Sequence, residues 1–119
     1  MKKIAVVDDT PVNLKLIDML LRQSYDIQLY NNGKEFLDAL NPAALPDLVI
    51  LDRMMPAPTG DEVCMQLKSQ PLTTAIPVIM CSALSSEVDI DDGLSAGADE
   101  YLTKPLDRND LLEAVDRLI

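Results

Sequence analysis

The sequence predicts an α/β fold in which five helices cover both faces of a five-stranded parallel sheet. Five short apolar segments alternate with five segments of helical periodicity along the 119 residues. Two of the apolar segments, 48–51 and 78–81, are continuous runs, which is typical of strands buried on both faces. The helices supply the crossovers that parallel strands require. Because the length suits one domain and no linker is visible, we expect residues 1–119 to form a single domain.

The first part of the chain predicts two strands and two helices. Residues 4–7 are apolar and lead directly into a pair of aspartates. Thr10 suits the N-cap of a helix and Pro11 its first position. Aliphatic residues at helical spacing extend this helix to about residue 23. Residues 27–30 alternate as a more exposed strand, and a short amphipathic helix follows.

The middle of the chain predicts a strand that ends in a charge. The buried run 48–51 leads into Asp52, and residues 53–60 form a loop that contains two prolines. A carboxylate at the end of a buried strand has little use in packing. Asp61 is a candidate N-cap for the next helix, which reaches about residue 69.

The last part predicts two further strands and two helices of unequal quality. The run 78–81 ends in Ser82, and residues 100–102 form a short strand. The helix expected over residues 85–96 is weak, since it contains three aspartates and an internal glycine. We expect its amides, over residues 87–96, to be the least protected from exchange of any helix. An amphipathic helix completes the chain.

The predicted strand ends bring chemically active residues together. For five such units the flavodoxin-like strand order 2-1-3-4-5 is expected, with a ligand site beyond the ends of strands one and three. Those ends carry Asp8, Asp9 and Asp52, while Ser82 and Lys104 follow strands four and five. Three close carboxylates repel one another unless a cation joins them, and oxygen ligands suit Mg²⁺. Together with a lysine that can pair with phosphate, they predict a phosphoryl-transfer site with Asp52 as nucleophile.

Composition excludes several other classes of function. The formal net charge of −10 argues against direct nucleic-acid binding, which needs clustered Lys and Arg. The absence of histidine removes the usual zinc ligands and the usual general base. Cys64 and Cys81 lie in apolar runs and are expected to be buried free thiols. With no long apolar segment and no signal-like start, we expect no membrane contact and a cytoplasmic location.

These motifs resemble the receiver domain of two-component response regulators, and the resemblance covers the whole chain. The segments that carry it, in family order and spacing, are Val6-Val7-Asp8-Asp9, Leu51-Asp52-Arg53-Met54-Met55-Pro56 with Gly60, Ser82-Ala83, Gly97-Ala98-Asp99 and Tyr101-Leu102-Thr103-Lys104-Pro105. One departure is Thr59, which precedes Gly60 where the family usually has an acidic residue, with Pro58 before it.

The resemblance implies a role for each residue of the site. Asp52 would be the phosphoacceptor. Asp9 would bind Mg²⁺ directly and Asp8 largely through water, and the backbone carbonyl of Met54 would complete the protein ligands. Lys104 would pair with the phosphoryl group, next to a peptide bond to the following proline that is typically cis in this family.

The resemblance also implies a signalling role. A sensor histidine kinase or phosphotransfer protein would phosphorylate the domain, which would catalyse its own phosphorylation and dephosphorylation without being an enzyme in its function. Ser82 and Tyr101 would be a switch pair, in which the hydroxyl bonds a phosphoryl oxygen and the ring turns inward. The face made by the fourth helix, fifth strand and fifth helix, residues 87–118, would then change its preference for a homodimer partner or an output domain.

Two functions of other classes stay open at this point. A Mg²⁺-dependent phosphohydrolase with an aspartyl-phosphate intermediate would need a second carboxylate two residues after Asp52, where Met54 stands. A receiver-like binding module that acts without phosphorylation would normally have lost the acidic pair or the lysine, and all are present.

Overall fold

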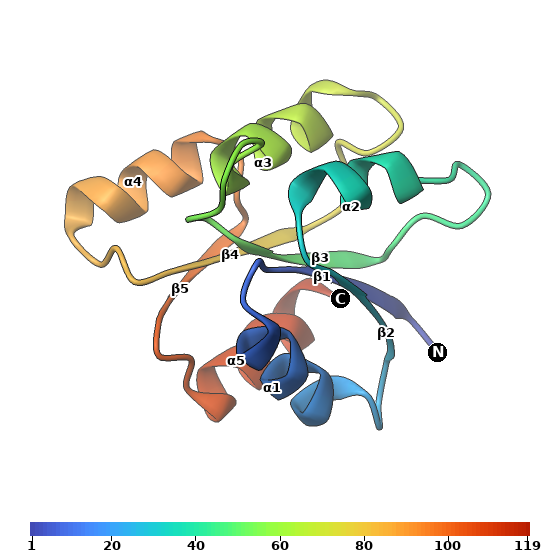
Figure 1. Cartoon of the computed structure of the whole chain (residues 1–119), viewed down its shortest axis with the longest axis horizontal. Helices are drawn as coiled ribbons and strands as arrows, with labels where there is room; N and C mark the ends of the chain where they lie inside the picture. The colour runs from blue at the N-terminus through green and yellow to red at the C-terminus, as the bar shows by residue number, and fades with distance from the viewer.

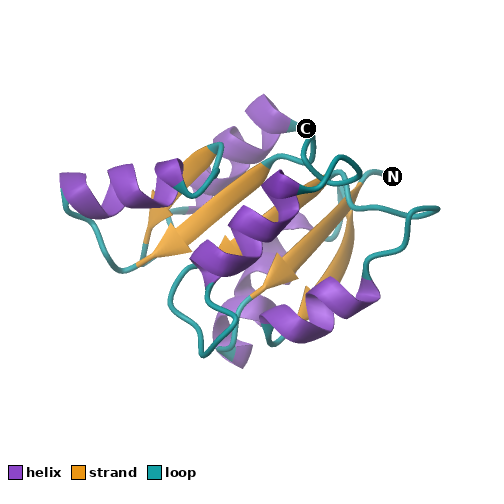
Figure 2. Cartoon of the chain, turned by 90° about the horizontal axis from the view of Figure 1, so that it is seen from above, coloured by secondary structure: helices purple, strands orange, loops and turns teal.

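The structure, a computed structural model, describes all residues from 1 to 119 and contains five strands that alternate with five helices. In chain order these are β1 (Lys3–Val7), α1 (Pro11–Leu21), β2 (Asp26–Tyr30), α2 (Gly33–Ala39), β3 (Leu48–Asp52), α3 (Gly60–Ser69), β4 (Val78–Ser82), α4 (Glu87–Ser95), β5 (Glu100–Thr103) and α5 (Arg108–Leu118). All neighbouring strands pair in parallel, in the order β2-β1-β3-β4-β5 (Figures 1 and 2). The predicted fold class and strand order are confirmed.

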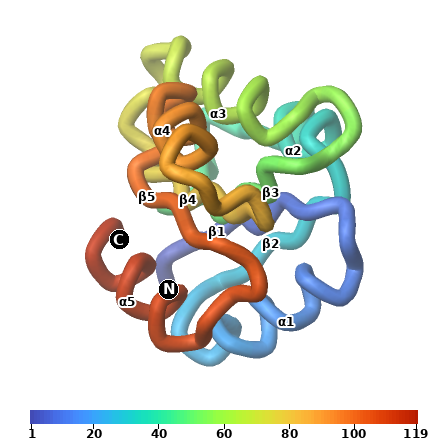
Figure 3. Tube along the Cα trace, turned by 90° about the vertical axis from the view of Figure 1, so that its left-hand side faces the viewer, coloured from blue at the N-terminus to red at the C-terminus, as the bar shows by residue number.

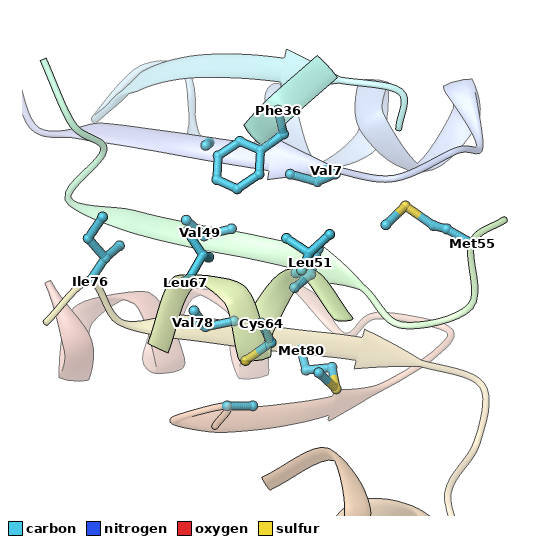
Figure 4. Close-up of a cluster of buried hydrophobic side chains, with 13 residues drawn as sticks. Val7, Phe36, Val49, Leu51, Met55, Cys64, Leu67, Ile76, Val78 and Met80 are labelled. Atoms are coloured by element: carbon cyan, nitrogen blue, oxygen red, sulfur yellow. The ribbon is translucent and has the colours of Figure 1, made fainter. Parts of the chain in front are cut away.

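The helices form two layers around the sheet. Helices α1 and α5 cover one face, and α2, α3 and α4 cover the other (Figures 1 and 3). Each interface has its own apolar cluster: Leu14 and Leu111 belong to the first, and Phe36 and Leu67 belong to the second (Figure 4). Because side chains alternate between the faces of a strand, the central strands contribute to both clusters.

Burial follows position in the sheet, as the sequence patterns predict. Every residue of β3 and of β4 is buried, since both strands have a neighbour on each side and a helical layer above and below. The edge strands β2 and β5 contain no fully buried residue. The two cysteines are buried and free, as expected.

Helix α3 begins differently from the prediction. Asp61 is not its N-cap; Thr59 is, and the predicted cap is wrong. The hydroxyl of Thr59 accepts the N–H of Glu62 at 3.2 Å, and the carboxylate of Glu62 accepts the N–H of Thr59 at 2.9 Å. This reciprocal capping box satisfies two free backbone donors at once. Asp61 is therefore free to use its carboxylate elsewhere.

Helix α4 has the least apolar support of the five. Gly93 is its only buried residue, whereas each of the others buries at least one branched or aromatic side chain. Its own start is well formed, because Ser86 and Asp89 make a capping box. No helix of the molecule has the length and apolarity that crossing a membrane requires.

Candidate functional site at the carboxyl ends of the strands

The predicted acidic cluster forms at one end of the sheet. Val7 pairs with Leu51 in the register of β1 and β3, so Asp8, which follows β1, and Asp52, the last residue of β3, lie side by side at this end of the sheet. Carboxylate oxygens of Asp8, Asp9 and Asp52 all lie within 4.8 Å of one another. Asp8 is 2% exposed and Asp52 is 4% exposed, while Asp9 is open to solvent.

Lys104 joins the two buried carboxylates. Its Nζ donates to Oδ2 of Asp8 at 3.2 Å and to Oδ1 of Asp52 at 3.1 Å. The main chain brings it there, because the N–H of Lys104 donates to the carbonyl of Ser82 at 2.8 Å, just past the end of β5. The peptide bond to Pro105 is cis, as the resemblance implies. Asp8 and Asp52, which lie 96 and 52 positions before the lysine in the sequence, thus share its ammonium group.

The electrostatics of the cluster favour an additional cation. Burial, together with the charge of Asp8, raises the pKa of Asp52 to about 6, although the hydrogen bonds from Lys104 and from the N–H of Met54 act in the opposite direction. Burial opposes the charge of Lys104, but the hydrogen bond and charge of Asp52 outweigh it and raise the pKa of Lys104. The site therefore holds its negative charge at a cost.

The donor set fits a small divalent cation. With all three aspartates ionised the cluster carries three negative charges, and Lys104 supplies one positive charge, which leaves two to be balanced. Carboxylate oxygens with one open side suit Mg²⁺, which keeps several waters and binds few protein groups. Met54, two residues after Asp52, is 60% exposed, so its sulfur plays no part in a buried site.

Ser82 and Tyr101 meet at the backbone of one residue. The buried Ser82 accepts the N–H of Leu84 at 3.1 Å on its Oγ. The Tyr101 hydroxyl donates to the carbonyl of the same Leu84 at 2.7 Å. Both side chains thus hold the turn between β4 and α4.

Arg53 is a functional candidate that sequence reasoning treated only as a neighbour of Asp52. Its side chain is 9% exposed and forms a two-point ion pair with Asp61, at 2.8 Å and 3.2 Å. It also reaches the carbonyl of Asp89 in α4 at 2.6 Å and the hydroxyl of Tyr101 at 3.4 Å. No spacing in the sequence indicates these contacts; an arginine directly after a buried strand was the only signal.

Comparisons with known proteins agree with this fold. Residues 4–116 match the family model described as the response regulator receiver domain. Response regulator PleD of Caulobacter vibrioides is 40% identical over 106 residues, which are 88% of this chain and 23% of PleD. Chemotaxis protein CheY4 of Vibrio cholerae has a TM-score of 0.90 at 27% identity, over 100% of this chain and 99% of that chain.

A second solved structure that is similar to this chain is that of an activated receiver domain. The BeF3-activated receiver domain of DrrB, from Thermotoga maritima, has a TM-score of 0.88 at 36% identity, over 99% of this chain and 97% of that chain. The chain spans less than half of the length of the curated relatives that it matches, from 23% to 49%.

Proposed function

Because the chain belongs to the response regulator receiver domain family, we propose that it carries a signal as a phosphoryl group on Asp52. We extend the proposal to residues 1–119 as one receiver domain, acting in the cytoplasm. The observation that supports it most directly is the shared ammonium group of Lys104, 3.1 Å from Asp52 and 3.2 Å from Asp8. The ammonium group of Lys104 can neutralise the negative oxygens of an incoming phosphoryl group while a carboxylate oxygen of Asp52 attacks its phosphorus.

The chemistry proposed for the site is an in-line phosphoryl transfer. A carboxylate oxygen of Asp52 attacks the phosphorus of a phosphohistidine or of a small phosphodonor, the bond to the leaving group breaks, and an aspartyl phosphate forms. Lys104 then exchanges part of its contact with the carboxylates for a phosphoryl oxygen. Attack by water on the same phosphorus returns inorganic phosphate and the free carboxylate.

Asp8, Asp9, Asp52 and the backbone carbonyl of Met54 would hold Mg²⁺. When bound, the ion supplies positive charge that neutralises the oxygens of the phosphoryl group. The residues of the chain orient the site: Asp8 and Asp52 are buried, and the N–H of Met54 donates to the Asp52 carboxylate at 3.3 Å.

Ser82 and Tyr101 are proposed to pass the state of Asp52 to the surface. The Ser82 hydroxyl stands at the end of β4, next to β3, since Asp52 pairs with Cys81. If Ser82 turns to donate to a phosphoryl oxygen, it changes its contact with Leu84, and Leu84 is the residue that also holds Tyr101. The output face formed by α4, β5 and α5 lies directly beyond, where a homodimer partner or an output domain would bind.

The phosphodonor, a sensor histidine kinase or a phosphotransfer protein, is proposed to bind along α1. Val12, Leu16 and Met19 are exposed apolar residues four and three positions apart, so they share one side of this helix. Helix α1 begins three residues after Asp8, and Met54 adds a further exposed apolar side chain beside the phosphoacceptor. Such a surface suits a helical partner that brings a phosphohistidine to Asp52.

Intact mass spectrometry after incubation with a small phosphodonor and Mg²⁺ tests the proposal. We expect one phosphoryl adduct, which is lost in Asp52→Asn and retained in a control, Asp47→Asn, at an aspartate that instead bonds the N–H of Lys3. Rapid multiple turnover of unrelated phosphate esters would favour a phosphohydrolase. No adduct with any donor would favour a binding module that acts without phosphorylation.

A further inference from the structure

Helix α4 depends on contacts other than apolar packing of its own side chains. Its only buried residue is Gly93, and Val88 is 69% exposed. A Cβ atom placed on Gly93 would lie 2.7 Å from Cε2 of Tyr101, so the helix backbone rests directly on the tyrosine ring. The position of α4 therefore follows the position of this ring and of any polar group that binds the helix.

Arg53 binds both the helix and the ring. Its Nη1 donates to the carbonyl of Asp89, inside α4, at 2.6 Å, and to the Tyr101 hydroxyl at 3.4 Å. The guanidinium carbon lies 5.9 Å from the centre of the Tyr101 ring, within the range of a cation–π contact. One side chain thus contacts the two groups on which the position of α4 depends.

The Arg53 guanidinium is held in place by Asp61. Asp61, in the first turn of α3, accepts from Nε at 2.8 Å and from Nη2 at 3.2 Å. A planar fork held at two points has one orientation, unlike a single contact. Because the Arg53 side chain is only 9% exposed, leaving this arrangement would strand a positive charge away from water.

The backbone of Arg53 belongs to the phosphorylation site. Its N–H donates to the carbonyl of Cys81 at 2.9 Å, and its carbonyl accepts the N–H of Gly60 at 3.1 Å. The residue before it is Asp52, and the N–H of the residue after it, Met54, donates to the Asp52 carboxylate at 3.3 Å. A change of charge and bonding at Asp52 therefore acts on both peptide neighbours of the residue that carries the guanidinium.

We propose that Arg53 is a positioning residue that couples phosphorylation of Asp52 to the positions of Tyr101 and helix α4. The inference rests on the proposed function, since it needs a phosphoryl group on Asp52. It goes further by adding a path that does not pass through Ser82. Coupling between two sites is reciprocal, so Arg53 also changes the affinity of Asp52 for a phosphoryl group.

The test compares four proteins: the wild type, Arg53→Gln, Arg53→Lys and the control Arg117→Gln. Arg117 also pairs with a carboxylate, Glu100 at 2.8 Å, beside Tyr101, but it is 55% exposed and lies far along the chain from Asp52. Beryllium fluoride with Mg²⁺ serves as the phosphoryl mimic. Hydrogen exchange is followed by mass spectrometry over α4, and the affinity for the mimic is measured by titration.

In the wild type and in Arg117→Gln we expect the mimic to change exchange in α4. In Arg53→Gln we expect the change in exchange caused by the mimic to be at least about fivefold smaller than in the wild type. We also expect the affinity for the mimic to differ from that of the wild type by about fivefold, which is the low end of ordinary coupling between sites. Arg53→Lys keeps the charge without the fork and should restore folding stability but not the response of α4. A loss of stability alone would alter α4 with and without the mimic equally.

The outcomes separate the inference from the function on which it rests. If the wild type binds no mimic and gains no adduct at Asp52, the proposed function is overturned and the inference falls with it. If the wild type responds and both Arg53 variants respond as strongly, the inference alone is overturned. Should Arg53→Gln fail to fold, the response of α4 in Arg53→Lys tests the inference instead. A full response in that variant would show that the two-point contact of the guanidinium is not needed and would overturn the inference.

Discussion

Replacing Asp52 by asparagine should make the metal-free protein more stable at neutral pH. Burial and the charge of Asp8 raise the pKa of this carboxyl from 3.8 to about 6. Between pH 3.8 and about pH 6, the folded state therefore keeps a proton on Asp52 that the unfolded state has already released. The free energy of unfolding falls as the pH rises through this window. A difference of about two pKa units corresponds to about 3 kcal/mol above pH 7, which is an upper limit for the gain in Asp52→Asn.

The structure indicates that Asp52→Asn can realise most of this increase in the free energy of unfolding. Asparagine keeps the shape of the side chain, and its oxygen can still accept from Lys104 and from the N–H of Met54. We expect Asp52→Asn to raise the free energy of unfolding by about 1 to 3 kcal/mol at pH 7.5. Asp26→Asn, at an exposed carboxylate at the start of β2, is the control for charge alone and should change it by less than about 0.5 kcal/mol.

Urea unfolding with a chelator present measures the effect. The gain should shrink at pH 4, where the wild-type carboxyl is already protonated in the folded state, and it should shrink when Mg²⁺ is added at pH 7.5, because the ion stabilises only the protein with the intact site. An Asp52→Asn protein that is less stable than the wild type, or a gain that persists unchanged at pH 4, would refute the reasoning.

Four further outcomes are expected. Mg²⁺ affinity, measured by titration, should fall below pH 6 as protons compete for Asp52, and a flat profile between pH 7 and pH 5 would contradict this. Lys104→Gln should raise the pKa of Asp52 further, as seen in a carboxyl titration by NMR, since the lysine acts to lower it. Gly93→Ala should shift the ring resonances of Tyr101, because the new methyl group would meet the ring; unchanged resonances would show that the contact is absent. Thr59→Ala should cost about 1 kcal/mol in unfolding by loss of a helix cap, and no cost would show that the capping box contributes nothing.

The buried strands and the acidic cluster could be predicted from the sequence because both depend on local patterns. A run such as residues 78–81 is apolar at every position, which indicates a strand between two layers, and β4 is buried throughout. Parallel strands all end at the same edge of a sheet. The chemical character of the residues at the carboxyl ends of β1 and β3 was therefore enough to place Asp8 and Asp52 together.

The contacts of Arg53 could not be predicted in this way. They depend on the direction of a long side chain and on partners 8, 36 and 48 residues away, in three other elements. No periodicity connects such positions. The start of α3 was missed for a related reason: both Thr59 and Asp61 can cap a helix, and the choice between them depends on the Glu62 side chain and on the ion pair that occupies Asp61.

The two side-chain contacts in the turn after β4 involve the main chain of residue 84 and not its side chain. The N–H of Leu84 donates to the Ser82 side chain, and its carbonyl accepts the Tyr101 hydroxyl. The main chain of one residue thus binds two side chains, and the Leu84 side chain takes no part in either contact. The identity of residue 84 is therefore nearly free as far as these contacts are concerned, and only proline, which has no N–H, would remove one of them. Evolution can alter the surface that residue 84 presents to a partner while both contacts, which belong to the main chain, stay intact.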